Sequence, residues 1–144
     1  MENKSYTTTI EVSRSPREVF NCIKEVSKWW SKDFKGNSTR LNDEFVICHP
    51  DLHYSNQKLI EVIPGKKVVW LVTDSKLNWL KKDKHEWTNT KMIFEIKTNE
   101  DKTVLHFTHE GLVTEKECYA RCEQGWNMVV KDHLLNFITD GKVI

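Results

Sequence analysis

The stretch that decides the fold is residues 114–140, TEKECYARCEQGWNMVVKDHLLNFITD. Its apolar residues recur at helical spacing, and about 25 residues at a rise of about 1.5 Å each make a helix of about 38 Å. We therefore predict one long helix from Thr114 to Asp140, with Gly141 as its left-handed cap. A helix of this length with one apolar face must pack against another layer of structure.

One face of this helix carries its large side chains when residues are placed at about 100° intervals. The residues in this sector are Cys118, Tyr119, Cys122, Trp126, Val129, Val130, His133 and Phe137. Gly125 lies at the edge of the face, where glycine costs a helix about 1 kcal/mol relative to alanine and lets a strand or a ligand approach closely. His133 lies at its centre, where an imidazole ring needs a hydrogen-bond partner.

The residues before this helix alternate between apolar and polar side chains, which is typical of strands. Ser15, Pro16 and Glu18 form an N-terminal helix signal, so a short helix should follow the first strand, and a second should cover residues 26–30. Residues 74–86 are polar and irregular, and we expect a loop or short helix there that forms a lid. The strands are expected at residues 5–13, 44–49, 53–63, 67–73, 87–97 and 103–112.

The composition indicates one globular domain over residues 1–144, with 38% hydrophobic and 30% charged residues. Lys and Arg total 22 against 21 Asp and Glu, and this balance argues against a nucleic-acid binder. No run approaches the roughly 20 apolar residues of a membrane span, and the first residues have no secretory signal pattern. We therefore expect a cytoplasmic protein whose 4 cysteines are reduced thiols.

Six sets of residues occur in a recognisable order along the chain. They are Ser15–Phe20 (SPREVF), Lys28–Trp30 (KWW), Glu61–Pro64 (EVIP) with Val69–Trp70 (VW), Trp87–Thr90 (WTNT), Thr108–Leu112 (THEGL) and Gly125–Trp126 (GW). Through them the chain resembles the START-like, or SRPBCC, superfamily, and within it the family named after the activator of the heat-shock chaperone ATPase. The resemblance implies an α+β helix-grip fold, in which a curved antiparallel sheet wraps around the long C-terminal helix.

The resemblance also implies an apolar cavity between the long helix and the sheet. We therefore expect non-catalytic binding of an apolar or amphipathic small molecule, such as a lipid, a sterol, a polyketide or a flavonoid, without a cofactor or a metal. The expected cavity walls are Trp29, Trp30, Phe45, Trp70, Phe94, Phe107, Trp126, Val130 and His133.

Two other functions are compatible with this fold. The first is a co-chaperone-like interaction module that stimulates a heat-shock chaperone ATPase through the outside of the sheet or lid; the further N-terminal domain of such activators is expected to be absent. The second is a cyclase- or aromatase-like enzyme, for which His133 and Tyr119 are the only polar groups that can be placed inside. No paired carboxylates and no Ser-His-Asp spacing point to His133 as catalytic.

Several of these residues also have plain structural interpretations. Each tryptophan can be simple core, and His133 can be a buried histidine bonded to a strand. Cys118 and Cys122, four apart on a helix, are more simply small core residues than a redox pair or half a zinc site. The histidines His49, His53, His106 and His109 are more simply hydrogen-bonded or solvated than metal ligands.

Overall fold

The sheet is a single seven-stranded layer with the order β1-β7-β6-β5-β4-β3-β2, and every neighbouring pair is antiparallel. The computed structural model describes residues 5–114 and 116–144. The strands are β1 (Ser5–Val12), β2 (Phe34–Gly36), β3 (Glu44–His49), β4 (His53–Ile63), β5 (Lys67–Leu77), β6 (Lys91–Asn99) and β7 (Lys102–Val113).

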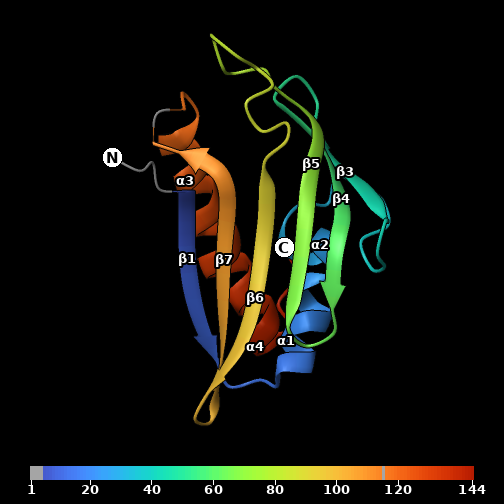
Figure 1. Ribbon diagram of the computed structural model, residues 1–144, viewed down its shortest axis with the longest axis vertical. Coiled ribbons are helices and arrows are strands. Elements are labelled where there is room, and N and C mark those ends of the chain that lie inside the picture. Colours follow the sequence, from blue (N-terminus) through green and yellow to red (C-terminus); the bar gives the residue numbers. More distant parts are fainter. Residues whose placement is uncertain (1–4, 115) are drawn as a thin grey trace.

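The helices all lie on one face of this sheet (Figure 1). Two short helices, α1 (Pro16–Ile23) and α2 (Val26–Trp29), follow β1. The long C-terminal helix runs without a break through α3 (Tyr119–Trp126), η1 (Asn127–Leu134) and α4 (Leu135–Asp140). This arrangement confirms the predicted α+β helix-grip fold.

The ends of the predicted elements are set by local hydrogen bonds. Ser15 and Glu18 form the reciprocal capping box at the start of α1, with bonds of 3.1 and 3.2 Å. Gly141 ends α4 at a φ of 67°, as the sequence predicted. Strands β3 and β4 have the predicted bounds, whereas β5 continues to Leu77 and β6 begins only at Lys91. The short strand β2 was not predicted.

The long helix differs from its prediction in two ways. It begins at Tyr119 instead of Thr114, and its middle segment, η1, is π-helical. A π-helix closes hydrogen bonds over five residues instead of four, so side chains after Trp126 no longer follow the 100° rule. As a result Leu134 is fully buried, while His133 is only half-buried.

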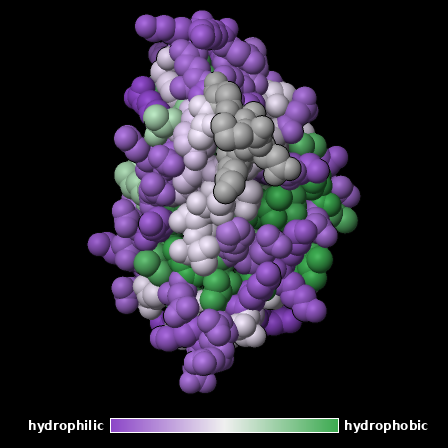
Figure 2. Space-filling view, turned by 60° about the vertical axis from the view of Figure 1, so that its left-hand side comes forward, coloured by the Kyte–Doolittle hydropathy of each residue, from purple (hydrophilic) through white to green (hydrophobic). Residues whose placement is uncertain are grey.

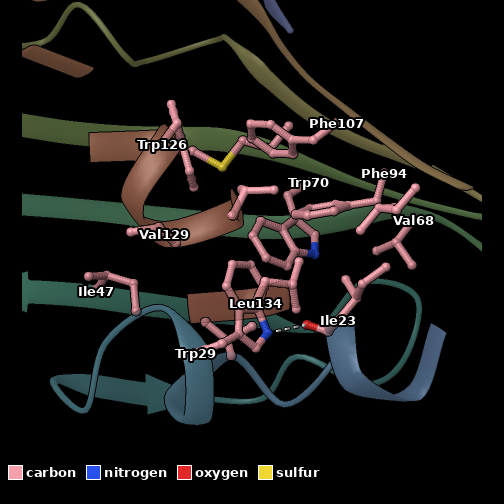
Figure 3. Packing of buried hydrophobic residues seen from close by; sticks show 14 of the residues in the cluster. Ile23, Trp29, Ile47, Val68, Trp70, Phe94, Phe107, Trp126, Val129 and Leu134 are labelled. Atoms are coloured by element: carbon pink, nitrogen blue, oxygen red, sulfur yellow. Dashed lines mark hydrogen bonds between the residues drawn. The ribbon is translucent and has the colours of Figure 1, made fainter. Parts of the chain in front are cut away.

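The interior between this helix and the central strands is filled by interlocking rings (Figure 3). The ring of Trp70 lies 6.2 Å from Trp29 in a stacked pair and 4.7 Å from Phe94. Phe107 continues the series, 4.9 Å from Phe94 and 4.7 Å from Trp126. Such centroid distances are those of aromatic rings in direct contact, so little space is left in this part of the interior.

The outer surface is mostly polar on the face shown in Figure 2, with hydrophobic side chains scattered between hydrophilic ones. Within residues 5–114 and 116–144, no helix combines the length and the apolar character that crossing a membrane requires.

Candidate ligand-binding site

A cavity of about 160 Å³ lies at one end of the helix–sheet interface, beside the connection between β5 and β6. We call it the tryptophan pocket, because four of its walls are indole rings. The connection supplies Trp79 and Trp87, and the other walls come from the residue that follows α2, from β4 and from the long helix. The full lining is Trp30, His53, Trp79, Trp87, Cys122, Gly125, Trp126 and Val129.

Gly125 provides the open space on the helix side of the pocket. It is three residues after Cys122 and four before Val129, so all three point to the same side of the helix. A Cβ atom built on Gly125 would meet no other part of the chain within 4 Å. Of the two explanations for this glycine, close approach of a strand is therefore excluded, and the unfilled space belongs to the pocket.

The indole walls are held in fixed mutual orientations. Trp87 and Trp126 are stacked, with centroids 5.8 Å apart and planes within 10°. The ring of Trp30 lies 5.1 Å from that of Trp126, and the rings of His53 and Trp87 lie 5.0 Å apart and nearly perpendicular. The lining contains no Asp, Glu, Lys or Arg. The pocket therefore suits an uncharged, flat guest.

His109 anchors the indole ring of Trp126 from behind. The Trp126 Nε1–H donates to His109 Nδ1 at 3.0 Å, so the histidine proton must be on Nε2, which donates to Thr90 Oγ1 at 2.8 Å. The Thr90 hydroxyl in turn donates to the carbonyl of Trp87. Complete burial, and then the charge of Lys116, lowers the pKa of His109 to about 3, which keeps the ring neutral.

Three of the segments that carry the family resemblance meet at this network. Thr90 ends the first, His109 and Gly111 belong to the second, and Trp126 to the third. Gly111 has a φ of +101°, and a Cβ there would lie 2.8 Å from Thr90 Cγ2. The glycine therefore lets β7 approach the Trp87–Thr90 turn closely.

His53 is the polar ring in the pocket wall. Burial, and then the nearby His49, lowers the pKa of His53 to about 4, and its Nε2 lies 2.8 Å from Ser55 Oγ. It is therefore neutral near pH 7, and the pocket lining carries no charged histidine there.

Cys122 places a thiol in the same wall, with Cys118 behind it on the preceding helical turn. The neighbouring Cys118 thiol lowers the pKa of Cys122, burial opposes this effect, and the nearby indole of Trp87 adds a smaller lowering. The neighbouring Cys122 thiol, and then burial and the Glu86 carboxylate, raise the pKa of Cys118. All four cysteines are free thiols. The Trp87 N–H is buried and has no hydrogen-bond partner within the described part of the chain.

The connection over the pocket is tied to the start of α3 by two reciprocal glutamates. Glu86 accepts the backbone N–H groups of Glu117 and Cys118 at 3.2 and 3.1 Å. Glu117 accepts those of Lys81 and Lys82, both at 3.0 Å. These bonds lower the pKa of Glu117, with the Lys82 amide as the largest cause. The segment predicted as a lid is thus fastened to the helix that forms the opposite wall.

The predicted cavity residues are distributed over three places. Trp30 and Trp126 line the tryptophan pocket. His133 lines a separate cavity of about 350 Å³ near the C-terminus, and its Nδ1 has no partner among the described residues. The other six are buried in the packed interior: Trp29, Phe45, Trp70, Phe94, Phe107 and Val130.

The remaining pocket residues were absent from the predicted cavity walls. Gly125 had a usable signal, because a glycine inside an amphipathic helix is costly. Trp79 and Trp87 had a weaker one, as large aromatics in or beside a polar connection. His53, Cys122 and Val129 had no signal that separates a pocket wall from core.

A Ser-His-Asp arrangement lies outside this pocket. His49 Nδ1 is 2.8 Å from Asp33 Oδ2, and His49 Nε2 is 3.4 Å from Ser31 Oγ. Ser31 is buried, however, and its oxygen already accepts the backbone N–H of Asp33. None of the three residues lines the pocket, so we interpret the arrangement as a tether between β3 and the segment after α2.

The hypothesis that the histidines and cysteines bind a metal ion is not supported by their arrangement. Among residues 5–114 and 116–144, no group of three or more His, Cys, Asp or Glu side chains is placed to hold an ion. His106 instead bonds Thr7 and Thr9 at 3.0 and 2.8 Å on the outer face of the sheet.

Comparison with known proteins agrees with this architecture. Residues 14–138 match the family described as Activator of Hsp90 ATPase homolog 1-like protein. The chain belongs to this family. It is therefore a member of the START-like, or SRPBCC, superfamily that the sequence suggested. No curated protein gave a significant match.

Solved structures show the same fold at low sequence identity. The Aha1 dimer from Colwellia psychrerythraea has a TM-score of 0.77 at 20% identity, covering 96% of this chain and 98% of that one. DynU16, from the dynemicin biosynthetic locus, has a TM-score of 0.69 at 12% identity; the match covers 99% of this chain and 49% of DynU16. The Mesorhizobium loti protein MLL2253 has a TM-score of 0.71 at 14% identity, covering 96% and 100%.

Proposed function

We propose that this member of the Activator of Hsp90 ATPase homolog 1-like family binds an uncharged apolar small molecule, without catalysis, in the tryptophan pocket. The observation that carries the proposal is the unfilled space opposite Gly125, bordered by four indole rings. Apolar cavities of about 150 Å³ accept a guest the size of benzene, and this pocket has about 160 Å³. A single ring fits, and a larger ligand such as a flavonoid enters by inserting one ring.

The volume separates the ligand classes that the fold allows. Pockets that enclose drug-sized ligands have about 300–1,000 Å³. A whole sterol or a fatty-acid chain therefore exceeds the space between Gly125 and Trp87, whereas toluene fills it. The packed rings around Trp70 leave no continuation of the pocket along the helix.

A titration followed by NMR tests this proposal. Toluene should shift the indole signals of Trp87 and Trp126 and the amide of Gly125, while oleate and cholesterol should leave all three unchanged. Gly125→Leu fills the space and should abolish the toluene shifts. Gln124→Leu is the matched control, because it adds the same side chain to the exposed side of the same helix. No shift with any apolar probe would contradict the proposal.

A second candidate is stimulation of a heat-shock chaperone ATPase, which the family description favours. This activity needs a protein-binding surface on the outside of the domain and does not need the pocket. An ATPase assay with purified chaperone therefore separates the two functions. Stimulation that is equal for the wild type and Gly125→Leu would assign the chaperone activity to a surface independent of the pocket; no stimulation would exclude it.

A further inference from the structure

The wall of the tryptophan pocket contains a buried hydrogen-bond donor, the indole N–H of Trp87, for which the described part of the chain supplies no acceptor. Trp87 is 6% exposed, and its ring is held by stacking on Trp126 and by nearly perpendicular contacts with His53 and His109. Buried donors in folded proteins almost always have a partner, because taking an N–H group out of water without one is costly. The unpartnered N–H therefore indicates an acceptor that comes from outside the chain.

Two other buried indoles show what sets Trp87 apart. The N–H of Trp126, in the same pocket wall, already donates to His109 Nδ1 at 3.0 Å. The N–H of Trp70 has no partner either, but Trp70 is fully buried among interior rings and does not line the pocket. Within the part of the chain that the structure describes, an unpartnered buried N–H coincides with a wall of this pocket only at Trp87.

The N–H edge of the Trp87 indole borders the space that Gly125 leaves open. The indole lies near the thiol of Cys122, on which it acts as a hydrogen-bond donor does by lowering the pKa. Cys122 is three residues before Gly125 on the same side of the long helix, and all three residues line the pocket. A guest in this space is therefore within reach of the Trp87 N–H.

Water is a poor partner for this N–H. A buried water molecule needs two to four polar partners, whereas most of the pocket lining is apolar. His53 Nε2 already lies 2.8 Å from Ser55 Oγ, and the thiol of Cys122 is only a weak hydrogen-bonding group. An acceptor oxygen attached to an aromatic ring is better suited, because the oxygen can pair with the N–H of Trp87 while the ring packs against the indoles.

We propose that the tryptophan pocket binds an uncharged aromatic carbonyl compound, an aryl aldehyde or ketone, whose oxygen accepts the N–H of Trp87. This inference rests on the proposed function, because the aromatic ring must occupy the space opposite Gly125, and it adds the polar group by which the ligand is recognised. The lining contains no Asp, Glu, Lys or Arg, which favours a neutral carbonyl over a carboxylate.

Benzaldehyde and styrene test this inference, because they share one planar shape and differ in a carbonyl oxygen against a CH₂ group. Their dissociation constants are measured by NMR titration of the full chain. Trp87→Phe keeps an aromatic wall but removes the N–H, so it should weaken benzaldehyde binding roughly two- to tenfold, the equivalent of one hydrogen bond, and leave styrene binding unchanged. Comparing the two guests in each protein cancels their different hydration. Trp70→Phe is the matched control and should leave the ratio of the two constants at its wild-type value.

A measurement on the wild type keeps the outcome decisive if Trp87→Phe fails to fold. The indole N–H proton of Trp87 should resonate further downfield in the benzaldehyde complex than in the styrene complex, because only benzaldehyde accepts it. The N–H proton of Trp126, which is bonded to His109, should resonate at the same position in both. Styrene binding with no such difference at Trp87, or an unchanged ratio of constants in Trp87→Phe, would overturn the inference and leave the proposed function standing. Absence of binding by toluene, styrene and benzaldehyde would overturn both.

Discussion

The two ends of the interface between the long helix and the sheet are built from the same residue type but differ in what they leave open. At one end Trp29 and Trp70 are stacked within a set of rings that fills the interior. At the other, four indoles surround a cavity of about 160 Å³. The difference lies in the helix, which presents Gly125 where a side chain would fill the space. Aromatic content alone thus does not identify a cavity; the missing side chain does.

The largest expected difference between the two ends is the loss of unfolding free energy when one tryptophan at each end is truncated. Trp70→Ala removes a fully buried ring and should lower the free energy of unfolding by about 3–5 kcal/mol. Trp79→Ala removes a half-buried ring of the pocket and should cost about 1 kcal/mol. Urea denaturation of both variants measures the difference. Equal costs would mean that the pocket end is as tightly packed as the interior.

Acid should weaken the pocket end, because two neutral histidines lie in or behind its wall. The pKa values of His53 and His109 are lowered to about 4 and about 3, so the unfolded chain binds protons below about pH 6.5 while the native chain does not. Their contribution to stability is complete above pH 6.5 and is lost as the pH falls towards the native values, at up to about 1.4 kcal/mol per pH unit for each histidine.

Unfolding free energies between pH 7 and pH 4.5 test this dependence. His53→Gln should flatten the slope by about one proton, whereas His106→Gln, on the outer face, serves as the matched control. An unchanged slope in His53→Gln would contradict the neutral state assigned to this ring.

A side chain at position 125 should stabilise the long helix and reduce the space in the pocket. Gly125→Ala should raise the free energy of unfolding by up to about 1 kcal/mol, because alanine is the better helix former and its Cβ meets no other part of the chain. The same variant should weaken toluene binding. Ala120→Gly, at an exposed position in the first turn of the same helix, should lower stability by less than this amount and leave toluene binding unchanged. A destabilising Gly125→Ala would show that the space is already occupied.

The smallest effect should come from weakening the hydrogen bonds that hold the β5–β6 connection to the segment before α3. Glu117→Gln weakens the acceptor of the Lys81 and Lys82 amides, so these two amides should exchange faster with deuterium. The amide of Val68, in the packed half, should exchange at its wild-type rate. Because the pKa of Glu117 is lowered, its contribution is present at neutral pH and is lost as the pH falls through its native value. Equal acceleration of all three amides would indicate global destabilisation instead.

Much of the fold could be predicted from the sequence, because local signals agreed with each other. The Ser15–Glu18 capping box set the start of α1, and Gly141 set the end of α4. The alternation of side chains along a strand placed Met92 and Phe94 on one face of β6, and both are fully buried. The family resemblance then supplied the topology, which these periodic patterns do not fix.

The site was harder to predict, because it depends on a difference in packing between similar side chains. Trp70 lies in β5 and Trp87 lies just before β6, but only Trp87 is next to a space that Gly125 leaves open. The π-helical segment after Trp126 changed which residue faces inwards, so Leu134 is buried where a regular helix would bury His133. No local sequence pattern predicts a π-helical segment of this kind. The His109 network was missed because its partners, Thr90 and Trp126, are brought together only by the folded chain.

The central claim is that the helix–sheet interface is filled except at the tryptophan pocket. The most direct test is a crystal structure of the protein soaked with 4-bromotoluene, with the bromine located by its anomalous scattering. The account predicts one bromine peak between Gly125 and the ring of Trp87. A peak among the rings of Trp70 and Phe94, or a pocket that remains empty at saturating ligand, would contradict it.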